Sequence, residues 1–431
     1  MKKVTMVKNV FATLFALLLC VSCSNHYDDS STNEKDQYTI TFNAAGGTGM
    51  MAAQTIPPGE TVALSANAYT RTYYTFAGWA TSSGSTTVAY TDTANYTMGN
   101  ANVALYAVWT ANTTGSATLE TLDAGGYTAM TAIPAVSAGA YTQATSASSG
   151  FVHSISPFAM GKYEVTYELW YTVYQWAISR PTDTYTFANA GREGNDGTIG
   201  AAPTAAKLEP VTTVSWRDCI VWCNAYSEMS GKPCVYYGDA GYTTPIRSSA
   251  DGSYGSSINT AAGSHDNPCV NPGAKGYRLP TEGEWQYAAS CAATYPYDYA
   301  SGADTKSDAT TGGSDVDGDG DVQYSGDVAW YSANNSPIGT KVVGTRSANK
   351  FGLCDLSGNV YEWCNDWYNP TVPTTAQTDY TGPAYDSAYP SRVLRGGTWN
   401  SGTLGFRVGN RLSGAPYTKD ICYGFRVCCG R

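Results

Sequence analysis

Apolar residues after position 165 recur with the spacing of an α-helix in two stretches. The two stripes consist of Leu169, Trp170, Val173 and Ala177, and of Cys219, Trp222, Cys223 and Tyr226. Thr166 and Ser215 precede the stripes as N-cap residues, and Thr281 forms a capping box with Glu284 three residues later. The pattern therefore predicts three helices, two of which pack an apolar stripe against a core.

Residues 38–110 follow a different pattern, in which apolar and polar positions alternate between glycine turns. The runs YTITF at residues 38–42 and NVALYAVW at residues 102–109 are typical of short β-strands. The chain has 431 residues, which is too long for one ordinary domain. We therefore expect a small β-rich module ahead of a larger domain that mixes helices and strands.

The first residues have the pattern of an export signal. Lys2, Lys3 and Lys8 precede an apolar run at residues 10–21, which is too short for a comfortable membrane span. A small residue follows and stands directly before Cys23, which resembles the lipobox of bacterial lipoproteins.

The resemblance to a lipobox implies a lipid anchor. We expect residues 1–22 to be removed as a signal peptide, Cys23 to be acylated, and residues 23–37 to form a polar tether. The alternative is plain secretion with cleavage nearby. A lipid anchor at Cys23 would place the protein in the cell envelope, attached to the outer membrane and facing the surface or the periplasm.

Composition excludes several classes of partner and site. Charged residues make up 14% of the chain, against about 25% in an average globular protein, and 25 Lys and Arg against 35 Asp and Glu give a net charge of −10. Nucleic acid is therefore not expected as a partner. The three histidines His26, His153 and His265 lie far apart, which argues against a multi-histidine metal centre. The ten cysteines after Cys23 contain no CxxC pair, so we expect buried thiols or disulfides rather than reactive groups.

Three motifs identify the first module. Residues 39–47, FAGW at residues 76–79 and LYAVW at residues 105–109 resemble, in order and spacing, a Listeria/Bacteroides repeat. The resemblance covers residues 38–110 and implies a small β-grasp-like fold that acts as a spacer or adhesion module. Residues 111–126 then form a linker.

Four further motifs follow in the larger domain. They are GYRLPTEGEW at residues 276–285, GLCDLSGNVYEW at residues 352–363, RGGTW at residues 395–399 and GFR at residues 424–426. Together they resemble the formylglycine-generating-enzyme family, also called sulfatase-modifying factors, over residues 127–431. The resemblance implies a C-type-lectin-like α+β fold with much irregular structure. Catalytic members of that family oxidise a sulfatase cysteine with copper held by two cysteines between the last two motifs.

The sequence departs from the family at the copper site. Between Gly397 and Gly424 the only cysteine is Cys422, and Asn400 and Ser401 near the expected positions offer no thiolate for a soft metal. We therefore expect no copper and lean towards a non-catalytic domain. The alternative, supported by the similarity of the whole domain, is a formylglycine-generating oxidoreductase that activates sulfatases.

We favour the hypothesis that the larger domain is a non-catalytic scaffold that binds a ligand. C-type-lectin-like domains often bind ligands near their C-terminal strands, here residues 399–423, which we call the C-terminal face. The proposed contact residues are Trp399, Asn400, Ser401, Thr403, Leu404, Phe406, Asn410, Ser413, Tyr417 and Lys419. Mixed aromatic and small polar side chains suit recognition of a protein or a glycan. Variable proteins of diversity-generating retroelements share this fold, and a purely structural surface protein is a third class.

Two acidic segments are calcium candidates. In the resembled family a calcium loop lies where this chain has Asp355, Gly358, Val360 and Glu362; the alternative is a plain turn stabilised by the same carboxylates. The second segment has carboxylates in the pattern of an EF-hand loop, at Asp315, Asp317, Asp319 and Asp321. Gly326 stands where the closing Glu belongs, so a solvated acidic loop is favoured there.

Overall fold

The structure is a computed structural model, and it describes residues 37–71, 74–111, 123, 125–134, 141–145, 148–250 and 255–430. The predicted signal peptide, the Cys23 anchor and most of the tether and linker lie outside the described residues. Within those residues, no helix is both long and apolar enough to cross a membrane.

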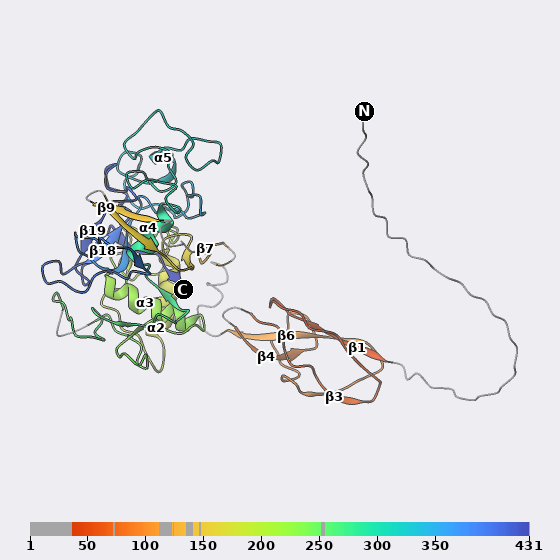
Figure 1. The fold of residues 1–431 in the computed structure, drawn as a ribbon. Helices are drawn as coiled ribbons and strands as arrows, with labels where there is room; N and C mark the ends of the chain where they lie inside the picture. Colours follow the sequence, from red (N-terminus) through yellow and green to blue (C-terminus); the bar gives the residue numbers. More distant parts are fainter. Residues whose placement is uncertain are drawn as a thin grey trace, which may run out of the picture.

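The N-terminal module is built from short strands, drawn in orange in Figure 1. Its elements are β1 (Tyr38–Asn43), β2 (Gln54–Ile56), β3 (Thr61–Ala63), β4 (Tyr74–Ala80), β5 (Asn95–Thr97) and β6 (Val103–Ala111). One sheet has the order β2-β1-β6-β4, with β1 and β6 parallel, and β3 pairs with β5. Trp79 is fully buried, with the rings of Phe42 and Phe76 each 4.9 Å away. This aromatic core agrees with the need of so small a module to bury large side chains.

Local sequence signals place the helices of the larger domain. They are α2 (Tyr167–Ile178), α3 (Trp216–Met229), α4 (Glu282–Ala289) and the short α5 (Ser325–Val328). Thr166 and Ser215 cap α2 and α3 as predicted, and Ser215 completes a capping box with Asp218. The capping box of Thr281 and Glu284 is confirmed at α4. Each cap satisfies amide groups that a helix leaves without partners at its start.

Two four-stranded sheets organise the larger domain. The first has the order β15-β21-β10-β7 and contains Tyr277–Arg278, Cys428–Cys429, Phe158–Gly161 and Met130–Ile133. The second has the order β19-β18-β16-β20 and contains Leu412–Gly414, Arg392–Arg395, Tyr361–Trp367 and Tyr423–Gly424. Both bring the C-terminal motifs beside strands far away in sequence.

The remaining strands are short and lie within long irregular stretches. They are β8 (Thr142–Thr145), β9 (Ser148–Ser154), β11 (Arg192–Glu193), β12 (Val211–Thr212), β13 (Tyr236–Tyr237), β14 (Cys269–Val270) and β17 (Gln377–Thr378). The sheets are β17-β9-β8, β11-β12 and β13-β14. An α+β fold with few helices and much irregular backbone is confirmed.

The main core lies where α2 and α3 pack together, which Figure 1 shows in green beside the blue C-terminal strands. Trp170 of α2 stacks on Trp222 of α3 with ring centroids 5.8 Å apart, and Phe425 meets both rings edge-on. The stripes predicted from the helical spacing therefore do face the core. Phe425 belongs to the GFR motif, so this motif is part of the framework.

Candidate binding face

The C-terminal face exposes most of the predicted contact side chains. Leu404 is 58% exposed. Asn400 and Lys419 are also exposed, and the partly exposed members are Ser401, Thr403, Asn410, Ser413 and Tyr417. The stretch is irregular between Trp399 and β19, so its side chains follow no strand alternation. The result is a surface of small polar groups around one apolar side chain.

Phe406 was predicted as a contact residue, and the structure shows that this was wrong. Its side chain is 0% exposed and its ring lies 4.8 Å from that of Tyr331. Trp399 is also buried, and its backbone amide donates to the carbonyl of Asn359 at 2.7 Å. Phe406 and Trp399 therefore lie beneath the face. Burial of their large apolar side chains stabilises the irregular backbone that carries the exposed residues.

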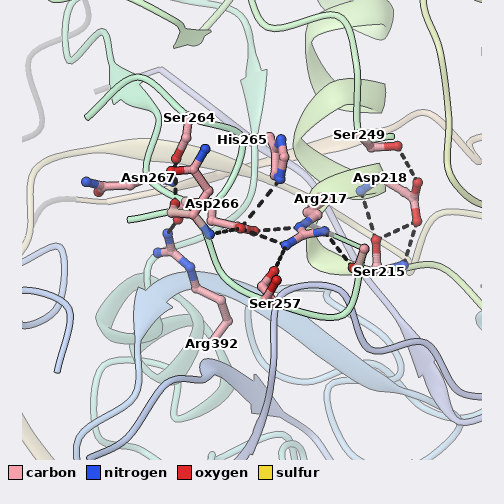
Figure 2. Close-up of polar contacts among 12 residues, drawn as sticks. Ser215, Arg217, Asp218, Ser249, Ser257, Ser264, His265, Asp266, Asn267 and Arg392 are labelled. Carbon is pink, nitrogen blue, oxygen red and sulfur yellow. Dashed lines mark hydrogen bonds and ion pairs between the residues drawn. The ribbon is translucent and has the colours of Figure 1, made fainter. Parts of the chain in front are cut away.

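A buried ion pair fixes the segment next to α3, as Figure 2 shows. The Arg217 guanidinium donates to both oxygens of Asp266, at 2.6 and 2.7 Å, and both side chains are almost completely buried. Arg217 also donates to the carbonyl of Ser257, and Arg392 donates to the carbonyl of Asp266 at 2.6 Å. Burial raises the pKa of Asp266, but His265 and Arg217 outweigh it, so the pKa lies below its usual value.

This ion pair lies directly beneath part of the C-terminal face. The amide of Arg217 donates to the carbonyl of Pro416 at 3.2 Å, and its guanidinium lies 5.5 Å from the ring centre of Tyr417. Lys419 donates to Asn189, whose amide donates to Asp218 at 2.6 Å. Residues 415–420 therefore rest on buried polar groups from α3 and from the loops that carry Asn189 and Asp266, and these groups hold the exposed side chains in place.

The other end of the face is fixed by arginines. Arg411 donates to both oxygens of Glu282, at 2.6 and 2.8 Å, and Arg395 lies 3.5 Å from the same carboxylate. Burial raises the pKa of Glu282, but the two guanidinium groups outweigh it and the pKa is lowered. Arg411 therefore belongs to the framework beneath the face.

The predicted calcium turn is buried and tightly bent. Asp355, Gly358 and Asn359 have φ angles of 60°, 82° and 55°, in the left-handed region that non-glycine residues rarely adopt. Asp355 accepts from the amide of Gly344 at 2.6 Å. Burial raises the pKa of Asp355 to about 6.

Two further groups complete this turn. Both oxygens of Glu362 accept from Arg426, at 2.6 and 2.7 Å, and one also accepts from the indole of Trp285. Glu164, which the sequence analysis missed, accepts from the amide of Val360 at 3.1 Å. Burial raises the pKa of Glu164 well above its usual value, and the carboxylates of Asp355 and Glu362 add to the effect. Glu362 forms the ion pair with Arg426, and Glu164 and Asp355 interact with the same guanidinium electrostatically.

Comparison with family models decides the identity of the two modules. The model described as sulfatase-modifying factor enzyme 1-like domain matches residues 119–430, and the Listeria-Bacteroides repeat domain matches residues 38–108. The chain belongs to the sulfatase-modifying factor family. Both resemblances inferred from the motifs are thereby confirmed.

Relatives of this family have different names. The chain is 29% identical over 275 residues to "Chaperone protein LppX" of Paenibacillus barcinonensis, which covers 62% of this chain and 78% of that protein. It is 35% identical over 155 residues to the formylglycine-generating enzyme of Streptomyces coelicolor, covering 35% of this chain and only 46% of the enzyme. Among solved structures it resembles Treponema denticola variable protein 1, with a TM-score of 0.50, 28% identity, and coverage of 70% of this chain and 94% of that protein.

The residues of this family member do not fit copper at the C-terminal face. Cys422 is the only thiol at residues 399–423, and burial followed by the neighbouring Asp420 raises its pKa to about 11. At the position expected for a copper ligand, the Ser401 hydroxyl accepts from the amide of Thr398 at 2.9 Å. A soft metal needs thiolates, and a single protonated thiol supplies none.

The ten cysteines of the described residues are all free thiols, seven of them buried.

The second acidic segment is only partly assembled. Carboxylate oxygens of Asp315 and Asp317 come within 4.8 Å of each other and of Asp304, a buried residue that the spacing did not reveal. Asp319 and Asp321 lie outside this group, and each accepts a hydrogen bond from an amide of its own loop, as Asp315 and Asp317 also do. The structure gathers Asp315 and Asp317 but not Asp319 and Asp321, and calcium binding by these four residues stays a prediction.

Proposed function

We propose that this chain is a cell-envelope protein whose sulfatase-modifying-factor domain binds a protein or a glycan through the C-terminal face, and that it does not oxidise sulfatases. One observation carries this proposal: exposed side chains stand on a backbone held by buried ion pairs, where catalytic relatives would need a cysteine pair. A rigid backbone lowers the entropic cost of binding because fewer groups must be ordered on association.

The likeness to Treponema denticola variable protein 1 supports a role in display. That protein is covered over 94% of its length at 28% identity. An irregular surface stretch tolerates changes of side chain when its backbone is fixed from below. We therefore propose that the exposed Asn400 and Leu404 and the partly exposed Thr403 differ between related proteins, as in a retroelement-diversified variable protein.

The location follows from the N-terminal segment. We propose that Cys23 is acylated, that the tether and the repeat separate the binding domain from the outer membrane, and that the domain faces the surface or the periplasm. Metabolic labelling with a clickable fatty acid tests this, with Cys23→Ala as the matched variant. Label that persists in the variant would rule out the anchor.

A calcium ion is the cofactor that we propose, held by Asp355, Glu362 and the backbone of the turn, with Glu164 nearby. Three buried carboxylates against one guanidinium support it, since a divalent cation balances excess buried negative charge. The group formed by Asp304, Asp315 and Asp317 is a second, more exposed candidate.

Oxidoreductase activity is the rival function, and it can be tested directly. Residues 24–431 are incubated with Cu(I), oxygen and a cysteine peptide carrying a sulfatase motif, beside a known active enzyme, and the peptide mass is followed. We expect an unchanged peptide. Conversion to the aldehyde would establish an enzyme and overturn the proposal.

The binding face is tested with purified protein on a glycan array and on an array of extracellular protein domains. We expect Leu404→Asp combined with Asn400→Ala to abolish each hit seen with the parent chain. The control is Ile178→Asp, an exposed apolar residue at the C-terminal end of α2. Hits that survive the face variant would discard the C-terminal face as the binding site.

A further inference from the structure

Lys419, Asn189 and Asp218 contact one another in that order at the edge of the C-terminal face, and we call them the triad. The Lys419 ammonium donates to the side-chain oxygen of Asn189, and the nitrogen of the same amide donates to Asp218 at 2.6 Å. Lys419 and Asn189 are 230 positions apart in the chain. The triad therefore joins three segments: the face, the loop after α2 and the first turn of α3.

Other lysines of the described chain show the ordinary partner of an ammonium group. The Lys207 nitrogen lies 2.9 Å from a carboxylate oxygen of Glu168. The Lys306 nitrogen lies 3.1 Å from a carboxylate oxygen of Asp298. Lys419 contacts a neutral amide instead, and the carboxylate of the triad lies on the far side of that amide. This order places an amine beside the carbonyl of the amide and a proton acceptor beside its NH2 group.

The carboxylate of the triad is buried and fixed. Figure 2 shows that the hydroxyls of Ser215 and Ser249 approach Asp218, and each donates to it at 2.6 Å. The backbone amide of Asn189 also donates to Asp218, at 3.2 Å. The Asn189 side chain is held in one orientation, because turning it over would set its oxygen against the carboxylate and its NH2 group against the ammonium.

The Asn189 amide is shielded from water. Its residue is only 8% exposed. Phe187, two positions earlier, packs against the rings of Trp170 and Tyr174, with centroids 5.8 and 5.2 Å away. Burial raises the pKa of Tyr174, and the charge of Asp218 is among the further causes, so this ring lies near the carboxylate. Exclusion of water suppresses hydrolysis of the amide, which is the reaction that competes with attack by an amine.

We infer that Lys419 and Asn189 become joined by an intramolecular isopeptide bond. The Lys419 side chain is exposed, so its amine gives a proton to solvent and then attacks the Asn189 Cγ, forming a C–N bond. Asp218 accepts a proton from the attacking nitrogen and returns one to the Asn189 side-chain nitrogen. The bond from Cγ to that nitrogen breaks, and one ammonia leaves. No oxidant is consumed, and a slow step suffices because each molecule reacts once.

This inference goes beyond the proposed function, because the bond forms whether or not the C-terminal face binds a ligand. It ties residues 415–420 covalently to the loop that carries Asn189. A covalent link between residues 230 positions apart restricts the unfolded chain, so it stabilises the folded state. Lys419 then presents an amide rather than a charge at the edge of the face.

Intact-mass spectrometry of residues 24–431, after reduction of the thiols, tests the inference. We expect most molecules to be lighter than the sequence mass by one ammonia, and a protease digest to contain a branched peptide with residues 189 and 419. Lys419→Arg keeps the positive charge but forms no such bond, so the sequence mass should return. Asp218→Asn removes the proton acceptor and should also restore the sequence mass.

The control is Lys207→Arg, the same replacement at an ordinary ion pair, which should keep the loss of ammonia. Circular dichroism confirms that each variant is folded. The full sequence mass in the parent chain overturns the inference, as does a loss of ammonia that persists in Lys419→Arg. Conversion of Asn189 to aspartate would show that water attacks the amide, which also overturns it. The measurement needs no ligand, so its failure is distinct from failure of the face to bind one.

Discussion

Two buried clusters of carboxylates and arginines differ in their balance of charge. Around Asp266, the carboxylate lies against Arg217 and its carbonyl accepts from Arg392, and the pKa of Asp266 is lowered. Around Glu362, Arg426 forms an ion pair with that carboxylate and interacts electrostatically with Glu164 and Asp355, and burial raises the pKa values of these two groups. The first cluster is complete within the chain. The second has more carboxylates than guanidinium groups, so a bound cation would change the free energy of unfolding there.

The largest expected effect comes from breaking the balanced cluster. Arg217→Met leaves the Asp266 carboxylate buried without its guanidinium, and we expect a loss of about 3–5 kcal/mol in the free energy of unfolding. Urea denaturation followed by tryptophan fluorescence measures it. A loss below about 1 kcal/mol would show that water or another group replaces Arg217.

Calcium should stabilise the protein through the carboxylate cluster around Glu362. A ligand present at a hundredfold excess over its Kd stabilises a protein by about 2.7 kcal/mol. We expect thermal unfolding to shift upwards with calcium in the parent chain and not in Glu164→Gln. Asp304→Asn serves as the control, because it alters the second candidate group and leaves the turn at Asp355 unchanged. If Asp304→Asn alone removes the shift, the ion binds in that loop.

A third prediction concerns pH at a carboxylate beside Arg392. Burial, followed by repulsion from Glu282, raises the pKa of Asp366 to about 8. The folded state therefore holds a proton that the unfolded chain releases near pH 4, so Asp366 lowers stability as the pH rises from about 4 to 8. Asp366→Asn keeps an acceptor for the Glu282 amide, and we expect it to flatten the fall in stability between pH 5 and 8. Chemical denaturation across that range measures the slope; equal slopes would contradict the assignment.

The smallest effect is expected at an exposed ion pair. Arg407 and Asp308 lie 3.5 Å apart, and Asp308 is more than half exposed. Asp308→Ala should change the free energy of unfolding by less than about 1 kcal/mol, because water screens the pair. This variant sets the baseline for the other three. A loss as large as that of Arg217→Met would mean that burial is not what separates the clusters.

The sequence predicted features whose causes lie within a few residues. Thr166, Ser215 and Thr281 cap helices as expected, because a cap needs only the next three amides. It did not predict that Phe406 points inward while Leu404 points outward. Irregular backbone has no period from which the buried side can be read.

The sequence by itself determined the family, the first residues of three helices and the absence of a second cysteine at residues 399–423. Tertiary structure decided which charges meet: Arg217 and Asp266 are 49 positions apart, and Arg426 and Glu362 are 64 apart. Local signals such as caps act through neighbouring amides. Pairing of distant charges depends on how long irregular segments pack, which no spacing along the chain encodes.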